Sequence, residues 1–176
     1  MKAKIWLGLG LAAISTTAAC TLAFAQPAAQ PEKPDPTHIP FILPADIPWT
    51  GTVGRQQQFK IFGDPAKPGP YVLLMKWYPG AFSRPHYHEK TRYITVISGT
   101  WWVSSSNRYD PSKTYPLPAG TVVRDEPMTV HWDGAKDAPV ILEISGEGPS
   151  PNINVGEDGK PLPPRTPSAP SAPRPE

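Results

Sequence analysis

The sequence predicts an all-β domain, a sandwich or barrel, between two proline-rich tails. Seven of the 26 prolines fall in residues 27–48 and nine in residues 149–176, which leaves ten for the middle hundred residues. That middle part contains short runs rich in Val, Ile, Thr and aromatic residues, separated by Gly, Pro, Asp and Asn. No eleven-residue window in it carries a convincing 3.6-residue apolar stripe, so helices are not expected there.

The first 25 residues have the three parts of a secretory signal peptide. A positive start with two lysines precedes an apolar, uncharged stretch over residues 5–24, and Ala23-Phe24-Ala25 is a small-x-small cleavage signal. A retained membrane anchor and lipidation at Cys20 are the alternatives. Cleavage after Ala25 predicts an exported protein, periplasmic or secreted, with no membrane span in the mature form. The mature chain would contain no cysteine, and therefore no disulfide and no thiol ligand.

The charge balance argues against nucleic acid as a partner. The chain has 17 basic and 15 acidic residues, and removal of Lys2 and Lys4 with the leader leaves 15 of each. It contains no run of five basic residues, so neither a nucleic-acid surface nor a polybasic membrane patch is expected. The length of 176 residues also argues against a two-domain enzyme with its own nucleotide-binding half.

The predicted elements follow one another along the chain. Residues 26–48 form a proline-punctuated arm, because fixed φ angles and missing amide donors exclude a helix or a central strand. Residues 49–147 form the barrel, and residues 148–176 form a low-complexity tail that is predicted to be polyproline-like or disordered. Strands are predicted at 57–62, 71–78, 92–98, 100–104, 121–124 and 140–145.

Three of the four histidines could meet at one point. His86 and His88 are two residues apart, and on a strand such residues project from the same face. His131 follows a glycine-bounded strand, and a neighbouring strand could bring it to that face. Imidazole is the commonest metal ligand in proteins, so the spacing points to a metal site. A polar strand face with a hydrogen-bonded core histidine is the other interpretation, and His38 is interpreted as a solvated or locally capping residue of the arm.

Around these histidines the sequence resembles the cupin family. The first cupin motif runs Gly, five residues, His-x-His, three or four residues, Glu, six residues, Gly. Gly80, His86-Tyr87-His88 and Gly99 stand at these spacings, but Arg92 occupies the position of the Glu.

The second cupin motif is matched less completely. It runs Gly, five residues, Pro-x-Gly, two residues, His, three residues, Asn. Gly120 and His131 fall on their positions, while Glu126, Met128 and Ala135 replace the Pro, Gly and Asn. The resemblance covers about residues 50–147 and implies a double-stranded β-helix, or jelly roll, with a metal ion inside its mouth.

The resemblance also implies a ligand set and partners. His86, His88 and His131 would hold a divalent metal ion, which could be Fe, Mn, Cu, Zn or Ni, and the usual Glu ligand is missing. Some cupins, among them thiol dioxygenases and a diketone-cleaving dioxygenase, hold ferrous iron with three histidines only. Three neutral imidazoles leave the metal charge uncompensated, which favours an anionic ligand or substrate. Cupins commonly pair through strand edges, so a homodimer is expected.

The position of Arg92 is the main open question about the site. An inward guanidinium would predict an anionic substrate held by its planar fork, whereas an outward one would form a salt bridge with Glu89, Asp125 or Asp133. The outward, structural role is favoured. The candidates for binding a small-molecule substrate are Arg92, Tyr93, Tyr78, Trp101 and Trp132.

Three functional hypotheses follow. The first is an exported mononuclear metalloenzyme of the oxygenase type, with three His ligands, acting on a small organic substrate. The second is a non-catalytic module that binds a metal ion or a small anion. The third is a structural role with a vestigial metal site. Metal content and turnover distinguish the three, because fold alone does not define function.

Overall fold

Eleven β-strands make up the part of the chain that the structure, a computed structural model, describes, which is residues 39–163. All of them lie in the compact unit that begins at Ile42. The predicted signal peptide, most of the predicted arm and residues 164–176 fall outside the described residues. The strands are Thr50–Thr52 (β1), Gln56–Phe62 (β2), Gly69–Trp77 (β3), His86–Tyr87 (β4), Arg92–Ser98 (β5), Thr100–Ser104 (β6), Tyr115–Pro118 (β7), Val122–Asp125 (β8), Trp132–Gly134 (β9), Val140–Gly148 (β10) and Ile153–Asn154 (β11).

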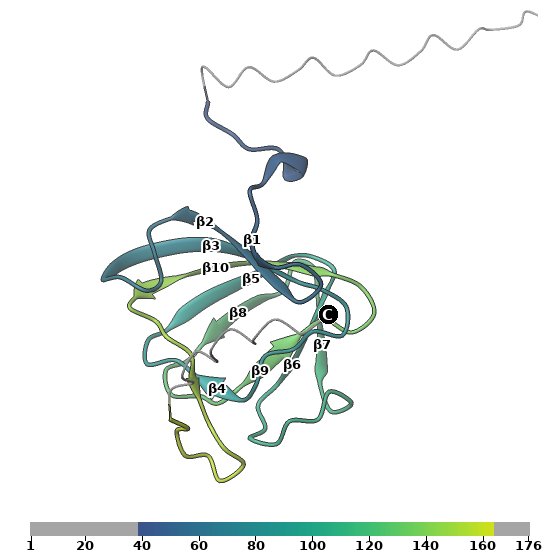
Figure 1. Ribbon diagram of the computed structural model, residues 1–176, viewed down its shortest axis with the longest axis vertical. Coiled ribbons are helices and arrows are strands. Elements are labelled where there is room, and N and C mark those ends of the chain that lie inside the picture. The colour runs from purple at the N-terminus through teal and green to yellow at the C-terminus, as the bar shows by residue number, and fades with distance from the viewer. Residues whose placement is uncertain (1–38, 164–176) are drawn as a thin grey trace, which may run out of the picture. The chain divides into compact units, whose positions relative to one another are not determined.

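The strands form two main layers (Figure 1). One layer is a six-stranded sheet in the order β1-β2-β3-β10-β5-β8, and the other is a three-stranded sheet in the order β7-β6-β9. The strands of both sheets pair antiparallel, and β4 forms a separate antiparallel pair with β11. This arrangement confirms the all-β jelly-roll prediction.

The core lies between the two layers and follows from the alternation of side chains along each strand. Ile94 and Val96 of β5 are each 1% exposed, whereas Tyr93 and Ile97 of the same strand are about half exposed. Alternate residues of β3 and β10 join this cluster, and Trp101 of β6 contributes from the opposite layer. Burial of these apolar side chains is the main stabilising term of the sandwich.

The passage from one sheet to the other after β5 requires a glycine. Gly99 has φ +78°, and a side chain there would collide with the carbonyl oxygen of Pro139. Because only glycine satisfies both conditions, the chain can end β5 at Ser98 and begin β6 at Thr100 without an intervening loop.

All six predicted strands are present, and β5 and β6 have the predicted bounds. The strands that were not predicted are β1, β4, β7, β9 and β11, which have two to four residues each and are too short to show a period. β7 also contains Pro116 and Pro118, and it lies at the edge of its sheet, where proline is tolerated.

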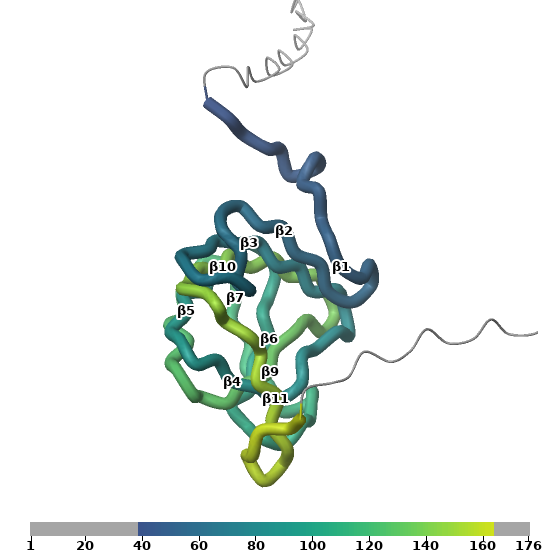
Figure 2. The backbone as a smooth tube through the Cα atoms, turned by 60° about the vertical axis from the view of Figure 1, so that its left-hand side comes forward, coloured from purple at the N-terminus to yellow at the C-terminus, as the bar shows by residue number. Residues whose placement is uncertain are grey.

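The predicted boundary between the barrel and the C-terminal tail lies too early in the sequence. β10 continues to Gly148, and β11 pairs with β4 next to the histidine motif (Figure 2). Val155 is 4% exposed, and its N–H donates to the carbonyl of Pro85 at 2.9 Å. Residues 149–163 are therefore part of the fold, because backbone pairing and one buried valine fix a segment whose composition is typical of a tail.

The described part of the arm, residues 39–48, contains a short 3-10 helix at Pro44–Asp46 and no strand. Pro44 is at the start of this helix, where its fixed φ angle is suitable and a missing N–H donor breaks no hydrogen bond. A short helix is therefore compatible with the high proline content of the arm. Within the described residues, no helix has the length and apolar character needed to cross a membrane.

Truncation tests the revised boundary. A chain that ends at Gly148 should lose at least about 2 kcal/mol of unfolding free energy, because it lacks β11 and the buried Val155 side chain. A chain that ends at Pro163 keeps every contact described above and should unfold like the full chain in urea. Equal stability of the two truncated chains would show that residues 149–163 contribute nothing to the fold.

Candidate metal centre

The backbones of His86 and His131 are hydrogen-bonded directly to each other. The N–H of His86 donates to the carbonyl of His131 at 2.9 Å, and the N–H of His131 donates to the carbonyl of His86 at 2.8 Å. This reciprocal pair joins β4 to the segment that leads into β9. Two residues that are 45 positions apart therefore present their side chains at one place.

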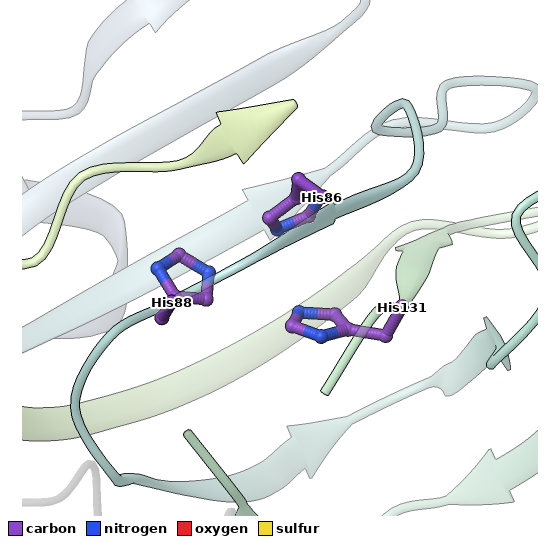
Figure 3. Close-up of side chains that lie close together, drawn as sticks. All are labelled: His86, His88 and His131. Atoms are coloured by element: carbon purple, nitrogen blue, oxygen red, sulfur yellow. The ribbon is translucent and has the colours of Figure 1, made fainter. Parts of the chain in front are cut away.

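Figure 3 shows the three imidazoles facing one another. The ring centroids are 4.5 Å apart for His86 and His131, 5.0 Å for His86 and His88, and 5.5 Å for His88 and His131. One nitrogen of each ring lies within 4.8 Å of the corresponding nitrogens of the other two. The structure thus brings together the three residues that the sequence proposes as ligands.

Met128 helps to position His88. Its N–H donates to the carbonyl of His88 at 2.7 Å, and its φ of +62° is the only positive value at a non-glycine residue among the described residues. A left-handed conformation is unfavourable for a side chain such as methionine. Met128 stands where the second cupin motif has glycine, and it adopts a left-handed conformation that glycine would adopt without strain.

Two of the imidazoles are held in one tautomer by backbone carbonyls. His86 Nδ1 lies 2.7 Å from the carbonyl oxygen of Arg84, and His131 Nδ1 lies 3.0 Å from that of Thr129. In both rings Nδ1 therefore carries the proton and donates, which leaves the lone pair on Nε2. Backbone carbonyls fix metal-binding histidines in this way in known metal sites.

Both histidines of the His-x-His pair are neutral at pH 7. Burial and the neighbouring His131 lower the pKa of His86 to about 4. Burial, followed by the positive charge of Arg92, lowers the pKa of His88 to about 2. Neutral imidazoles offer the lone pair that a metal ion requires.

His88 supplies the observation that best tests the fit of a metal ion. Its side chain is 1% exposed, and neither of its ring nitrogens meets hydrogen-bond geometry with a partner among the described residues. The backbone carbonyl of Pro151 is the one nearby acceptor that acts on this ring, and it offsets only part of the lost hydration, since burial dominates and lowers the pKa. Coordination would compensate the remaining loss, so these three residues fit a divalent metal ion, with ligand chemistry that suits Zn, Cu, Fe or Ni.

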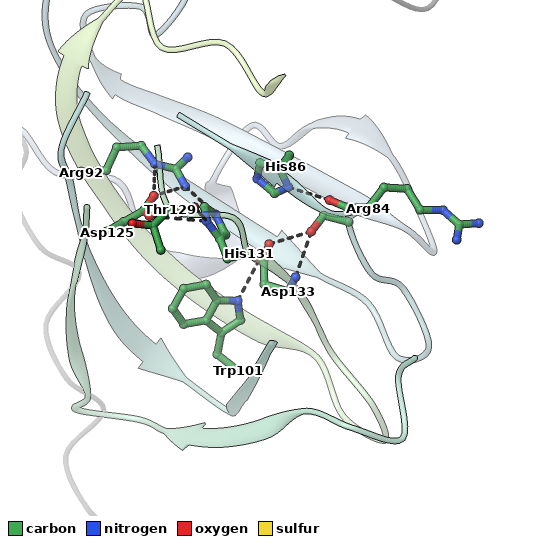
Figure 4. Close-up of polar contacts among 9 residues, drawn as sticks. Arg84, His86, Arg92, Trp101, Asp125, Thr129, His131 and Asp133 are labelled. Atoms are coloured by element: carbon green, nitrogen blue, oxygen red, sulfur yellow. Dashed lines mark hydrogen bonds and ion pairs between the residues drawn. The ribbon is translucent and has the colours of Figure 1, made fainter. Parts of the chain in front are cut away.

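Arg92 lies inside the fold, which corrects the favoured outward orientation. Its side chain is 12% exposed and donates to Asp125 Oδ2 from Nη2 at 2.7 Å and from Nε at 2.9 Å. Arg92 and Asp125 are directly opposite each other on β5 and β8, and one of the anticipated ion pairs is thus present. Nη2 also lies 3.4 Å from His131 Nε2 (Figure 4). A protein carboxylate therefore stabilises this cation beside the three histidines.

A cavity of about 470 Å³ adjoins the histidine cluster. His86, Arg92 and Trp101 line it, together with apolar side chains of β3, β5 and β10 and with further polar and charged residues. Its size is in the range of small-molecule sites. The complete lining is Gly51, Thr52, Arg55, Gln56, Met75, Trp77, Phe82, Ser83, Arg84, His86, Arg92, Ile94, Trp101, Asp133, Ile144, Asn152 and Asn154.

Only two of the five predicted substrate-binding residues line this cavity, namely Arg92 and Trp101. Tyr93 is on the outer face of β5 with 54% exposure. Tyr78 instead donates to Gln57 Oε1 at 2.6 Å. Trp132 is fully buried and donates to the carbonyl of Ser106, so it belongs to the core. The prediction used only the closeness of these residues to the motifs in the sequence, and this criterion does not tell whether a side chain points into the cavity, into the core or to the surface.

Several residues of the cavity were missed by the sequence analysis. Asp133 is two positions after His131, and strand alternation would have placed it on the same side. Met75 and Trp77 share the parity of the core residues of β3, so the same rule applies to them. Asn152 and Asn154 lie in the segment that was assigned to the tail and gave no signal.

The metal-free protein should become less stable as the pH falls from 7 to 5. The unfolded chain protonates its histidines near pH 6.5, whereas folded His86 and His88 stay neutral until well below that pH. The unfolded state then binds more protons, and the loss is on the order of 2–4 kcal/mol across this interval. Urea unfolding of chelator-treated protein measures it. His88→Leu should reduce the pH dependence by about half, and an identical dependence in both proteins would contradict the assignment.

Comparison with known proteins supports the fold. No protein-family model and no curated protein matches the sequence. Among solved structures, the polyketide cyclase RemF from Streptomyces resistomycificus is similar, with a TM-score of 0.51 and 15% identity over 68% of this chain and 88% of that chain. A cupin 2 domain-containing protein from Halorhodospira halophila has a TM-score of 0.50 and 20% identity, over 62% of this chain and 77% of that chain. The chain therefore has the cupin fold that its histidine motifs imply.

Proposed function

We propose that this protein is an exported metalloenzyme that holds one divalent metal ion at His86, His88 and His131. The main support is His88, a buried imidazole whose ring nitrogens meet hydrogen-bond geometry with no partner among the described residues and have only the Pro151 carbonyl nearby. It forms a triangle with the two imidazoles whose Nδ1 atoms are fixed by carbonyls. A structural histidine cluster would leave most of that desolvation cost uncompensated.

The adjoining cavity supports catalysis on a small organic molecule. His86 is part of the cavity lining, so a bound molecule would lie beside the histidine cluster. Trp101 forms one wall and is held there by a 2.8 Å hydrogen bond from its Nε1 to Asp133 Oδ2. One structure of similar fold belongs to an enzyme, a polyketide cyclase. Fold similarity at this level does not identify the reaction.

Within this proposal we favour an oxygenase. A bound divalent metal ion would supply Lewis-acid chemistry and, if it is redox-active, activation of dioxygen. The residues of the chain orient and desolvate the site. Thr129 and Arg84 fix the tautomers of His131 and His86 through their carbonyls, and the Arg92–Asp125 pair borders His131.

A non-catalytic metal-binding or anion-binding module is the second candidate. The 3.4 Å contact from Arg92 Nη2 to His131 Nε2 favours it, because a cation already lies beside the lone pair that a metal ion would use. Such a site would bind metal more weakly than three free imidazoles do. Stoichiometric binding without turnover would support this candidate.

Metal analysis tests the central proposal. The protein exported by its own leader should contain about one equivalent of a single divalent metal ion by plasma mass spectrometry, and His86→Ala/His131→Ala should contain almost none. His38→Ala is the matched control and should retain the metal. If the wild-type protein stays free of metal after reconstitution with Fe, Mn, Cu, Zn and Ni, the metalloenzyme proposal fails.

Oxygen consumption separates the two candidates. The metal-loaded protein should consume dioxygen with at least one member of a panel of catechols, flavonols, diketones and thiols. Bound metal without turnover on the panel would favour the binding module. N-terminal sequencing of the exported form, expected to begin at Gln26, and light scattering, expected to give a dimer, test the proposed export and the proposed homodimer.

Arg92 should weaken metal binding. Arg92→Gln removes a cation beside His131 and leaves the Asp125 carboxylate near the site, so the affinity for Zn²⁺ should rise by about tenfold. Competition with a chromophoric chelator measures this change. Arg124→Gln, on the adjacent strand and 62% exposed, is the control and should leave the affinity unchanged. Unchanged or weaker binding by Arg92→Gln would show that the guanidinium does not oppose the metal ion.

A further inference from the structure

We propose that the 470 Å³ cavity binds a small organic anion, a carboxylate with an apolar body, and that Trp77 and Arg92 donate hydrogen bonds to its oxygen atoms. This inference names the substrate class for the function proposed above and rests on that function for its catalytic meaning. The binding itself depends on residues of the cavity that are not metal ligands.

The first observation is an indole N–H without a partner. Trp77 lines the cavity and is 6% exposed, and its Nε1 has no hydrogen-bond partner among the described residues. An indole nitrogen can only donate, so the missing partner is an acceptor. A buried donor of this kind calls for an explanation, and a bound oxygen atom provides one.

The second observation is the free edge of the Arg92 guanidinium. Nε and Nη2 donate to Asp125, whereas Nη1 makes no hydrogen bond within the described residues. Figure 4 shows this third nitrogen turned away from Asp125. Arg92 lines the cavity with its guanidinium cation. It therefore provides a second donor, which is held in place by its ion pair.

The charges around the cavity also favour an anion. Arg55, Arg84 and Arg92 line it against a single carboxylate, that of Asp133. Both oxygens of Asp133 already accept a hydrogen bond, Oδ1 from Ser83 Oγ at 2.8 Å and Oδ2 from Trp101 Nε1 at 2.8 Å, which reduces the attraction of this carboxylate for a cationic ligand. With Asp125 included, the lining carries three positive and two negative side chains. A divalent metal ion at the three histidines would increase this excess.

The walls define the rest of the ligand. Met75, Ile94 and Ile144 are apolar, and Trp101 and Phe82 add aromatic surface. A small hydrated ion such as sulfate would engage only the polar part of the lining and would leave these apolar side chains without a partner. An aromatic or aliphatic group would instead bury apolar surface against them.

Paired probes test the proposal on metal-free, chelator-treated protein. Titration calorimetry compares 3-phenylpropionate with 3-phenylpropionamide, and 1-naphthylacetate with 1-naphthylacetamide, because each pair differs in charge and hardly in shape. At least one carboxylate should bind about tenfold more tightly than its amide. Equal binding within both pairs, or no binding of any probe up to about 10 mM, would overturn the proposal.

Substitutions test the assigned donors. Trp77→Phe keeps an aromatic ring but removes the N–H, and it should weaken carboxylate binding about tenfold and amide binding much less. Trp102→Phe is the matched control, because Trp102 does not line the cavity and packs under Lys136. Arg55→Gln should weaken carboxylate binding severalfold, while Arg108→Gln, at a position with 78% exposure outside this cavity, should not. Equal carboxylate affinity in Trp77→Phe and wild type would exclude Trp77 as a donor.

The outcome is separable from that of the metal experiment. Carboxylate selectivity without any metal content would retain this inference and refute the metalloenzyme. Bound metal without carboxylate selectivity would refute this inference and retain the metalloenzyme proposal. His88→Leu, which cannot complete the three-histidine site, should keep the preference for the carboxylate, because the donors belong to other residues.

Discussion

The candidate site depends on one backbone interaction, the reciprocal hydrogen bonds between His86 and His131. This pair joins the two motif segments at a fixed register, and a shift of one residue on either side would turn an imidazole to the opposite face. The third ligand follows from it, because His88 is two residues further along the same segment and its carbonyl accepts from Met128. The rigid two-layer core thus sets the geometry of the histidines before any ligand binds.

The chemistry around the histidines is divided between two sides. On one side, Arg92 and Asp125 form a nearly buried ion pair that borders His131. On the other, Trp77, Trp101 and several apolar side chains lie next to His86 in the cavity that Arg92 also lines. Replacement of the expected glutamate by Arg92 changes the charge of this position by two units, and the carboxylate of Asp125 on the neighbouring strand compensates part of this change. The proposed preference for an anion rests on this cationic lining beside the three histidines.

Much of the fold could be predicted from local patterns. The strands with five or more residues showed their composition and turn signals in the sequence, and all of them were found. Of the described strands with two to four residues, β8 alone was predicted, because the others are too short to show a period, and β11 was hidden in a proline-rich segment that composition assigns to a tail. Tyr93 and Arg92 are adjacent on β5, so their side chains project from opposite faces of the sheet. The inward orientation of Arg92 therefore requires the outward orientation of Tyr93.

The sequence by itself determined the fold class and the three candidate ligands, because motif spacing encodes which residues share a face. It also determined that the candidate ligands are imidazoles and not thiols. Only the tertiary structure decided the direction of Arg92, since that depends on a carboxylate 33 residues away on β8. The cavity walls, the indole donor of Trp77 and the inclusion of residues 149–163 were decided in the same way. Each depends on contacts between segments that are distant in sequence, and no local pattern records such contacts.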